Sequence, residues 1–151
     1  MPVRSLTGLL VLICPAILSA QSPRFEAGLQ GLALLTDHGY VGGGPWIGWR
    51  PASHLRLGLL TTTGTRGRSL AGRLEGAVHL LVDPDRQHGA TVYGTIGLAL
   101  DLSHGTREYL LAGLGLEGTP GRRGGWVIEA GAGGGWRVSA GYRWRWGMRR
   151  R

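Results

Sequence analysis

Hydrophobic and polar residues alternate along most of the chain with a period of two. In the segment 136–146, Trp136, Val138 and Trp144 occupy one set of alternate positions, whereas Arg137 and Arg143 occupy the other. This period is typical of a β-strand, in which successive side chains point to opposite faces of the sheet. The pattern therefore predicts eight strands, at 24–35, 40–50, 54–62, 68–82, 90–101, 107–117, 125–133 and 136–146.

Short breaks separate the eight segments. They contain the Gly, Pro, Asp and Ser residues that turns use, and each is short enough to close a hairpin. The run from Gly42 to Pro45 lies inside the second segment and indicates a bulge or a break there. Eight strands joined by hairpins predict an all-β, up-and-down antiparallel sheet.

The two faces of the expected strands differ in size as well as in polarity. The apolar face carries Trp, Leu, Val and Ile, and the polar face carries many glycines. The interior of an eight-stranded barrel is only just wide enough for side chains, so the bulky face would overfill it. The pattern favours a transmembrane β-barrel, with the apolar face toward lipid and the polar face inside. A soluble barrel or sandwich, with the charged face in water, is the alternative.

Charges of both signs fall on the polar face and nearly balance. Enclosed charges need partners, so we expect a paired network in the barrel interior. On this basis, Arg143→Ala should destabilise the barrel more than Arg150→Ala, because only Arg143 would leave enclosed carboxylates unpaired. The expected members of the network are Glu26, Arg56, Arg73, Glu75, Glu117, Glu129, Arg137, Arg143 and Arg145.

Aromatic residues gather near the ends of the segments. Transmembrane barrels place Trp and Tyr in girdles at the two membrane interfaces. Core aromatics or a sugar-binding platform are the alternatives. The expected girdle consists of Phe25, Trp46, Trp49, Trp126, Trp136 and Tyr142, and Trp144 and Trp146 lie close to it in the sequence.

The first twenty residues have the layout of a secretory signal peptide. Arg4 provides a positive start, an apolar run extends from Leu6 to Leu18, and small residues precede Gln21. A membrane-anchor helix is the alternative, but the apolar run is short and contains Pro15. We therefore expect a signal peptide at 1–20, a barrel domain at 21–146 and a basic tail at 147–151.

Composition and motif searches narrow the possible functions. The chain has 29 Gly among 151 residues, a hydrophobic fraction of 42% and a single cysteine, which exclude collagen, disorder and a disulfide scaffold. A net charge of +8 is compatible with binding to nucleic acid, but the export signal argues against that partner. No zinc, phosphate-loop or Gly-x-Ser-x-Gly pattern occurs, and the five histidines are expected at the surface. We therefore expect no enzyme activity, no metal and no cofactor.

The signal peptide, the eight amphipathic strands and the final aromatic strand together resemble small bacterial outer-membrane β-barrels of the OmpA/OmpX type. The last strand resembles the C-terminal assembly signal of that family at Ser139, Gly141, Trp144 and Trp146. The resemblance implies a monomer in outer-membrane lipid, inserted by the barrel-insertion machinery. The family usually ends on the aromatic residue, whereas this chain continues through 147–151. The outer loops of that family are often long, whereas all loops of this chain are short. We therefore expect neither an adhesive loop nor a plug.

Three functions follow from this reading. The first is an integral outer-membrane barrel with a closed polar interior and a structural or undefined role, too narrow to be a wide pore. The second is a secreted, lipocalin-like barrel that binds an apolar ligand, with Leu57, Val78, Ile96 and Trp126 pointing inward. The third is a lipid-modifying enzyme, for which the His-x-Ser pairing of one deacylase group has only His104-Gly105-Thr106 as its nearest counterpart.

Overall fold

The computed structural model describes residues 24–103 and 105–147. The expected signal peptide, His104 and the arginines of the tail at 149–151 lie outside these residues. Within them, no helix is both long enough and apolar enough to cross a membrane.

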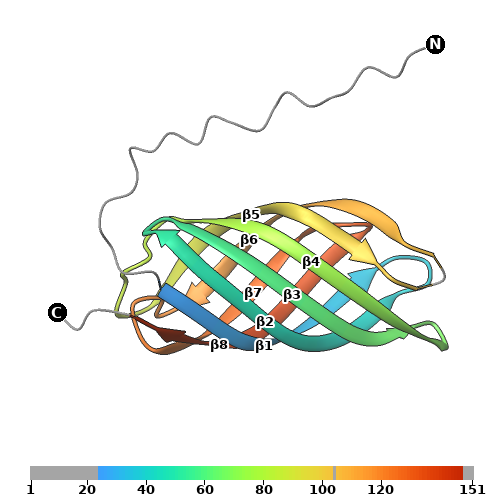
Figure 1. Ribbon diagram of the computed structural model, residues 1–151, viewed down its shortest axis with the longest axis horizontal. Helices are drawn as coiled ribbons and strands as arrows, with labels where there is room; N and C mark the ends of the chain where they lie inside the picture. The colour runs from blue at the N-terminus through green and yellow to red at the C-terminus, as the bar shows by residue number, and fades with distance from the viewer. Residues whose placement is uncertain (1–23, 104, 148–151) are drawn as a thin grey trace, which may run out of the picture.

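Eight antiparallel strands form a closed barrel in chain order, so that β1 pairs with both β2 and β8. Figure 1 shows the strands slanting around the long axis of the barrel. The predicted all-β, eight-stranded architecture is confirmed, and three strands have the predicted bounds. The strands are β1 Arg24–Leu35, β2 Tyr40–Ala52, β3 Leu55–Arg66, β4 Ser69–Leu81, β5 Ala90–Asp101, β6 Arg107–Gly118, β7 Gly124–Ala132 and β8 Trp136–Trp146.

Alternate residues of every strand face opposite sides of the wall. Most outward positions are apolar, and Ile96 in the middle of β5 is 61% exposed although it is a large aliphatic residue. Most charged residues of the strands take the inward positions and are buried. This orientation is the reverse of a soluble barrel, which buries its apolar face and exposes its charged one.

The predicted irregularity in β2 occurs on one side of the strand. The residues from Gly42 to Pro45 pair continuously with β1, whereas the pairing with β3 skips Gly44 and Pro45 without a change of register. The register with β3 shifts only later, between Trp49 and Ala52. Strand β3 also continues through Gly64, which the sequence pattern assigned to a turn. A Cβ on Gly64 would lie 2.1 Å from the carbonyl oxygen of Val41, so this glycine permits close strand approach rather than a turn.

Both ends of the barrel are closed. At the terminal end, where β1 begins and β8 ends, the β4–β5 connection (82–89) packs against the β6–β7 connection (119–123). Arg50 donates a hydrogen bond to the carbonyl of Pro84 at 3.4 Å, and Arg145 donates to the carbonyl of Arg122 at 3.2 Å. Buried arginines therefore anchor both short connections at this end of the barrel.

The opposite end is closed by side chains. An apolar cluster there contains Leu32, Leu34, Tyr40 and Ala71. The Tyr40 hydroxyl lies 2.8 Å from Thr62 Oγ1, and Arg66 forms an ion pair with Asp101 at the ends of β3 and β5. The polar interior of the barrel therefore lies between two closed ends.

Candidate functional site

The interior of the barrel collects buried charged side chains from most of its strands. All nine residues of the expected charge network face inward and are at most 5% exposed. Arg50, His79 and Asp101 are equally buried but were not among the residues expected in the network. Arg50 was not predicted to face inward because the expected break in β2 left the orientation of its side chain undefined. Counting alternate positions back from Arg56 through the β2–β3 hairpin nevertheless indicates an inward side chain.

The first group of charges, here called the terminal cluster, lies toward the terminal end. It contains Glu26, Arg50, Arg56, Glu117 and Arg145. Arg56 Nη1 lies 2.6 Å from Glu117 Oε2 and 3.3 Å from Glu26 Oε2. Arg50 pairs with both glutamates, and Arg145 pairs closely with Glu117. Two carboxylates are therefore shared among three guanidinium groups.

The second group, here called the central cluster, joins β4, β7 and β8 across the interior. It contains Arg73, Glu75, Glu129 and Arg137. Arg137 Nη2 lies 2.7 Å from Glu75 Oε2, its Nε also donates to Glu75, and its Nη1 pairs with Glu129. Arg73 Nε lies 2.7 Å from Glu75 Oε1. Two carboxylates here face two guanidinium groups, so the charges of the central cluster sum to zero.

Arg143 belongs to neither cluster. Its guanidinium Cζ lies 3.8 Å from the centre of the Trp46 ring, and its Nη2 donates to Gln30 Oε1 at 3.3 Å. No ion pair joins it to a carboxylate within the described chain. The expectation that Arg143→Ala would leave carboxylates unpaired is therefore wrong, because the side chain stacks on an aromatic ring and binds an amide instead.

Trp46 lies inside the barrel and is only 2% exposed, so its assignment to the aromatic girdle is wrong. Glycines on its own strand and the next provide the space. A Cβ on Gly48 would lie 2.2 Å from Trp46 Cη2, and one on Gly58 would lie 3.1 Å from Trp46 Nε1. The alternation of inward and outward positions along β2, rather than the residue type, determines that the Trp46 side chain points inward.

The other aromatic residues assigned to the girdle point outward. Their distribution is uneven, because only Trp136 lies at the opposite end. The remainder lie near the terminal end on the adjoining strands β7, β8, β1 and β2, together with Trp144 and Trp146. Exposed aromatic side chains at this end are Phe25, Trp49, Trp126, Tyr142, Trp144 and Trp146.

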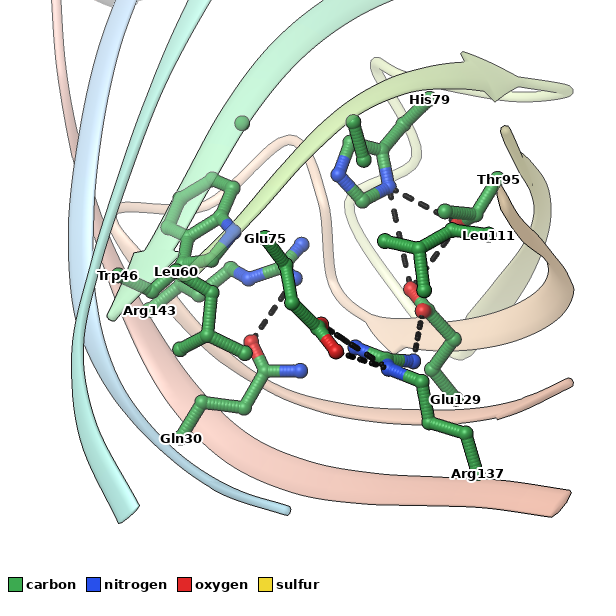
Figure 2. A pocket seen from close by; sticks show the side chains of 12 residues that line it. Gln30, Trp46, Leu60, Glu75, His79, Thr95, Leu111, Glu129, Arg137 and Arg143 are labelled. Atoms are coloured by element: carbon green, nitrogen blue, oxygen red, sulfur yellow. Dashed lines mark hydrogen bonds and ion pairs between the residues drawn. The ribbon is translucent and has the colours of Figure 1, made fainter. Parts of the chain in front are cut away.

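His79 is buried, whereas the histidines were expected at the surface; His38, His54 and His88 are exposed. Figure 2 shows His79 above Thr95 and Glu129. The Thr95 hydroxyl donates to Glu129 Oε2 at 3.0 Å and lies 3.1 Å from His79 Nδ1. In a nucleophilic triad, the histidine stands between the hydroxyl and the acid. Here the hydroxyl stands between the other two, so the group is arranged for structural hydrogen bonding.

A cavity of about 10 Å³ lies beside these residues and is lined by Trp46, Glu75, His79, Glu129 and Arg143, among others (Figure 2). A cavity of this size holds roughly one water molecule. It has no room for an apolar ligand, and Leu57, Ile96 and Trp126 are exposed on the outer wall. The lipocalin-like alternative is therefore wrong. No group of three or more His, Cys, Asp or Glu side chains in the described chain is placed to hold a metal ion.

The residues of the expected assembly signal divide between the two faces of β8. Ser139 is buried and accepts a hydrogen bond from Gln30 Nε2 at 2.7 Å, whereas Trp144 and Trp146 point outward. Gly141 lies opposite Gln30 in the β1–β8 pair. The same residues therefore help to close the barrel between its first and last strands.

We expect Gly141→Ala to destabilise the barrel by about 1–3 kcal/mol, the usual cost of overpacking. The new Cβ would lie 2.3 Å from the Leu29 carbonyl oxygen and 2.9 Å from Gln30 Cα, both backbone atoms that cannot move freely. Gly94→Ala is the matched control, because a Cβ there meets nothing within 4 Å. Urea midpoints measured by tryptophan fluorescence should separate the two variants; equal midpoints would contradict the closeness of the β1–β8 contact.

Comparison with known proteins supports the fold and goes no further. No protein family and no curated protein matches the chain. The N-terminal β-barrel domain of Pseudomonas aeruginosa OprF is similar in structure, with a TM-score of 0.63, 15% identity, and coverage of 83% of this chain and 98% of that one. The de novo designed TMB2.3 has a TM-score of 0.55 and 17% identity, covering 84% and 98%.

Proposed function

We propose that this protein is a small integral outer-membrane β-barrel with a structural role, whose closed polar interior stabilises the wall and does not conduct solutes. The observation that carries the proposal is the orientation of the wall. Large aliphatic and aromatic side chains are exposed on all eight strands, while buried arginines and glutamates fill the interior. Exposing this much apolar surface to water is costly, and a bilayer removes the cost.

The architecture also suits a bilayer. A transmembrane β-strand needs about 9–11 residues when it is tilted, and the strands here contain 9 to 13 residues. A closed barrel has no free sheet edge, so its wall satisfies its backbone polar groups without water. The structural likeness to an OprF barrel domain supports the same proposal.

The closed interior argues for a stabilising rather than a transporting role. Both ends are covered, and the cavity beside Arg143 has a volume of only about 10 Å³. A solute would have to break ion pairs of the terminal and central clusters to pass. The same proposal includes insertion by the outer-membrane machinery through Ser139, Gly141, Trp144 and Trp146, and a monomeric state surrounded by outer-membrane lipid.

Membrane fractionation tests the location. We expect the protein in the outer-membrane fraction, released only by detergent, and we expect boiled and unboiled samples to migrate differently on a denaturing gel. Recovery of folded protein from the soluble periplasmic fraction without detergent would refute the proposal.

A charge on the outer wall should destabilise the protein according to its depth. In lipid vesicles, Ile96→Arg in the middle of β5 should lower the free energy of unfolding by about 2–4 kcal/mol, as arginine does at the centre of a bilayer. Leu70→Arg, at the second residue of β4, should cost about 0–1 kcal/mol because strand ends lie near the interface. Urea titration in vesicles measures both, and equal small effects would count against a membrane-embedded wall.

A further inference from the structure

The outer wall carries a single charged side chain. Among the outward positions of the eight described strands, only Glu108 is charged. It is exposed, and no ion pair or hydrogen bond joins its carboxylate to another described side chain. Ionisable side chains that face lipid are rare, and they usually mark a functional site. A partner for this carboxylate would therefore come from outside the chain.

Glu108 lies at one end of a groove in the same wall. It is the second residue of β6, and it pairs with Leu100 near the end of β5. Gly76 and its partner Leu59 lie near the middle of β4 and β3. The groove therefore runs from the opposite end of the barrel toward the middle of the wall. It has a volume of about 290 Å³ and is lined by Leu59, Leu74, Gly76, Leu98, Leu100 and Glu108.

Gly76 provides the open space at the inner end of the groove. A Cβ on Gly76 would meet nothing within 4 Å, although its paired neighbours on either side are Leu59 and Leu98. The volume is close to the lower bound of small-molecule sites, about 300 Å³, so the groove admits a slender chain rather than a bulky ring system. Apart from Glu108 the lining is apolar, so a fitting occupant has a hydrocarbon body and one positively charged end.

We propose that the groove binds one lipid with a primary ammonium headgroup, its nitrogen on Glu108 and one acyl chain running past Gly76. A lipid in one leaflet holds its headgroup at the interface and its chains toward the bilayer centre, and the groove has the same order of charge and leucines. A primary ammonium group donates hydrogen bonds, and an ionised carboxylate accepts them. The exposed Arg107 precedes Glu108, so this end of the groove also carries a positive charge for the lipid phosphate. The inference rests on the proposed membrane location.

Retention of lipid by the folded protein tests the headgroup. The full-length protein in detergent micelles is mixed with equal amounts of phosphatidylethanolamine and phosphatidylglycerol with identical acyl chains, and native mass spectrometry measures the lipid retained. We expect one phosphatidylethanolamine molecule, preferred about two- to fivefold, as an exposed ion pair allows. Glu108→Gln should abolish the preference, yet leave the urea midpoint in lipid-free micelles nearly unchanged. Equal retention of the two lipids, or a preference for phosphatidylglycerol with or without magnesium, would overturn the proposal.

Filling the groove tests the position of the acyl chain. Gly76→Val should lose most of the retained phosphatidylethanolamine, because the new side chain would occupy the groove. Gly94→Val is the matched control, since a Cβ at either glycine meets nothing within 4 Å and Gly94 lies outside the groove. Equal retention by the two variants would contradict the site.

Insertion into vesicles separates this inference from the proposed function. Heat-modifiable gel mobility after reconstitution reports whether the wall enters a bilayer. Normal insertion without a lipid preference would overturn the lipid site alone, whereas failure to insert into vesicles of either lipid would overturn the membrane location as well.

Discussion

Glu117→Gln is expected to lower the free energy of unfolding by about 3–5 kcal/mol, the range observed when one partner of a buried ion pair is removed. Glu117 is fully buried and pairs with Arg50, Arg56 and Arg145. Without its charge, three guanidinium groups would share the single carboxylate of Glu26. Glutamine preserves the volume of the side chain, so the loss reports charge rather than a cavity. Urea titration in detergent micelles measures it.

The matched control for this substitution is Glu108→Gln. Glu108 is exposed on the outer wall near the start of β6, and changing an exposed carboxylate usually costs less than about 0.5 kcal/mol. A loss for Glu117→Gln no larger than that of the control would show that the terminal cluster does not hold the barrel together.

The strands could be predicted because the period of two is a local property. Each strand presents one face to the outside and one to the inside, so the alternation can be read from a dozen residues at a time. The bounds of β1, β5 and β8 agree with the prediction to the residue. The closed barrel followed from the number of strands and the short connections between them.

Residue type misled the prediction where a side chain departs from the usual chemistry of its face. Trp46 was assigned to the outer wall because it is aromatic, yet it occupies an inward position beside Gly48 and Gly58. His79 was expected at the surface with the other histidines, most of which lie in or beside turns, yet it packs inside between Trp46 and Tyr93. In both cases, position along the strand outweighs residue type, because a one-residue shift would turn the whole strand over.

Contacts across the barrel were not predictable from the sequence. The pairing of Arg56 with Glu117 joins β3 to β6, which are not neighbours in the sheet. Which charges meet depends on the stagger of the strands and on the reach of long side chains, and neither leaves a local pattern. For the same reason, the loop that closes the terminal end was missed, since its anchor on Arg50 appears only in three dimensions.

The partners of the inward arginines predict unequal effects for two similar substitutions. Arg137→Met is expected to destabilise the barrel by about 3–5 kcal/mol, because it removes the guanidinium group that joins Glu75 to Glu129 and leaves Glu129 without an arginine. Arg143→Met should be close to neutral. Arg143 forms no ion pair within the described chain, so the variant loses only the stacking on Trp46 and the hydrogen bond to Gln30, and this loss is offset because a buried unpaired charge is removed.

The comparison between these variants is informative because both arginines lie on β8, face inward and are nearly inaccessible. Burial alone predicts equal losses, whereas carboxylate pairing predicts a large loss for Arg137→Met only. Arg123→Met in the exposed β6–β7 connection provides the baseline. Urea midpoints and the retention of heat-modifiable gel mobility measure which of the variants is the most destabilised. An order in which Arg143→Met is the more damaging variant would mean that stacking on Trp46, rather than ion pairing, is the main interaction that stabilises the interior.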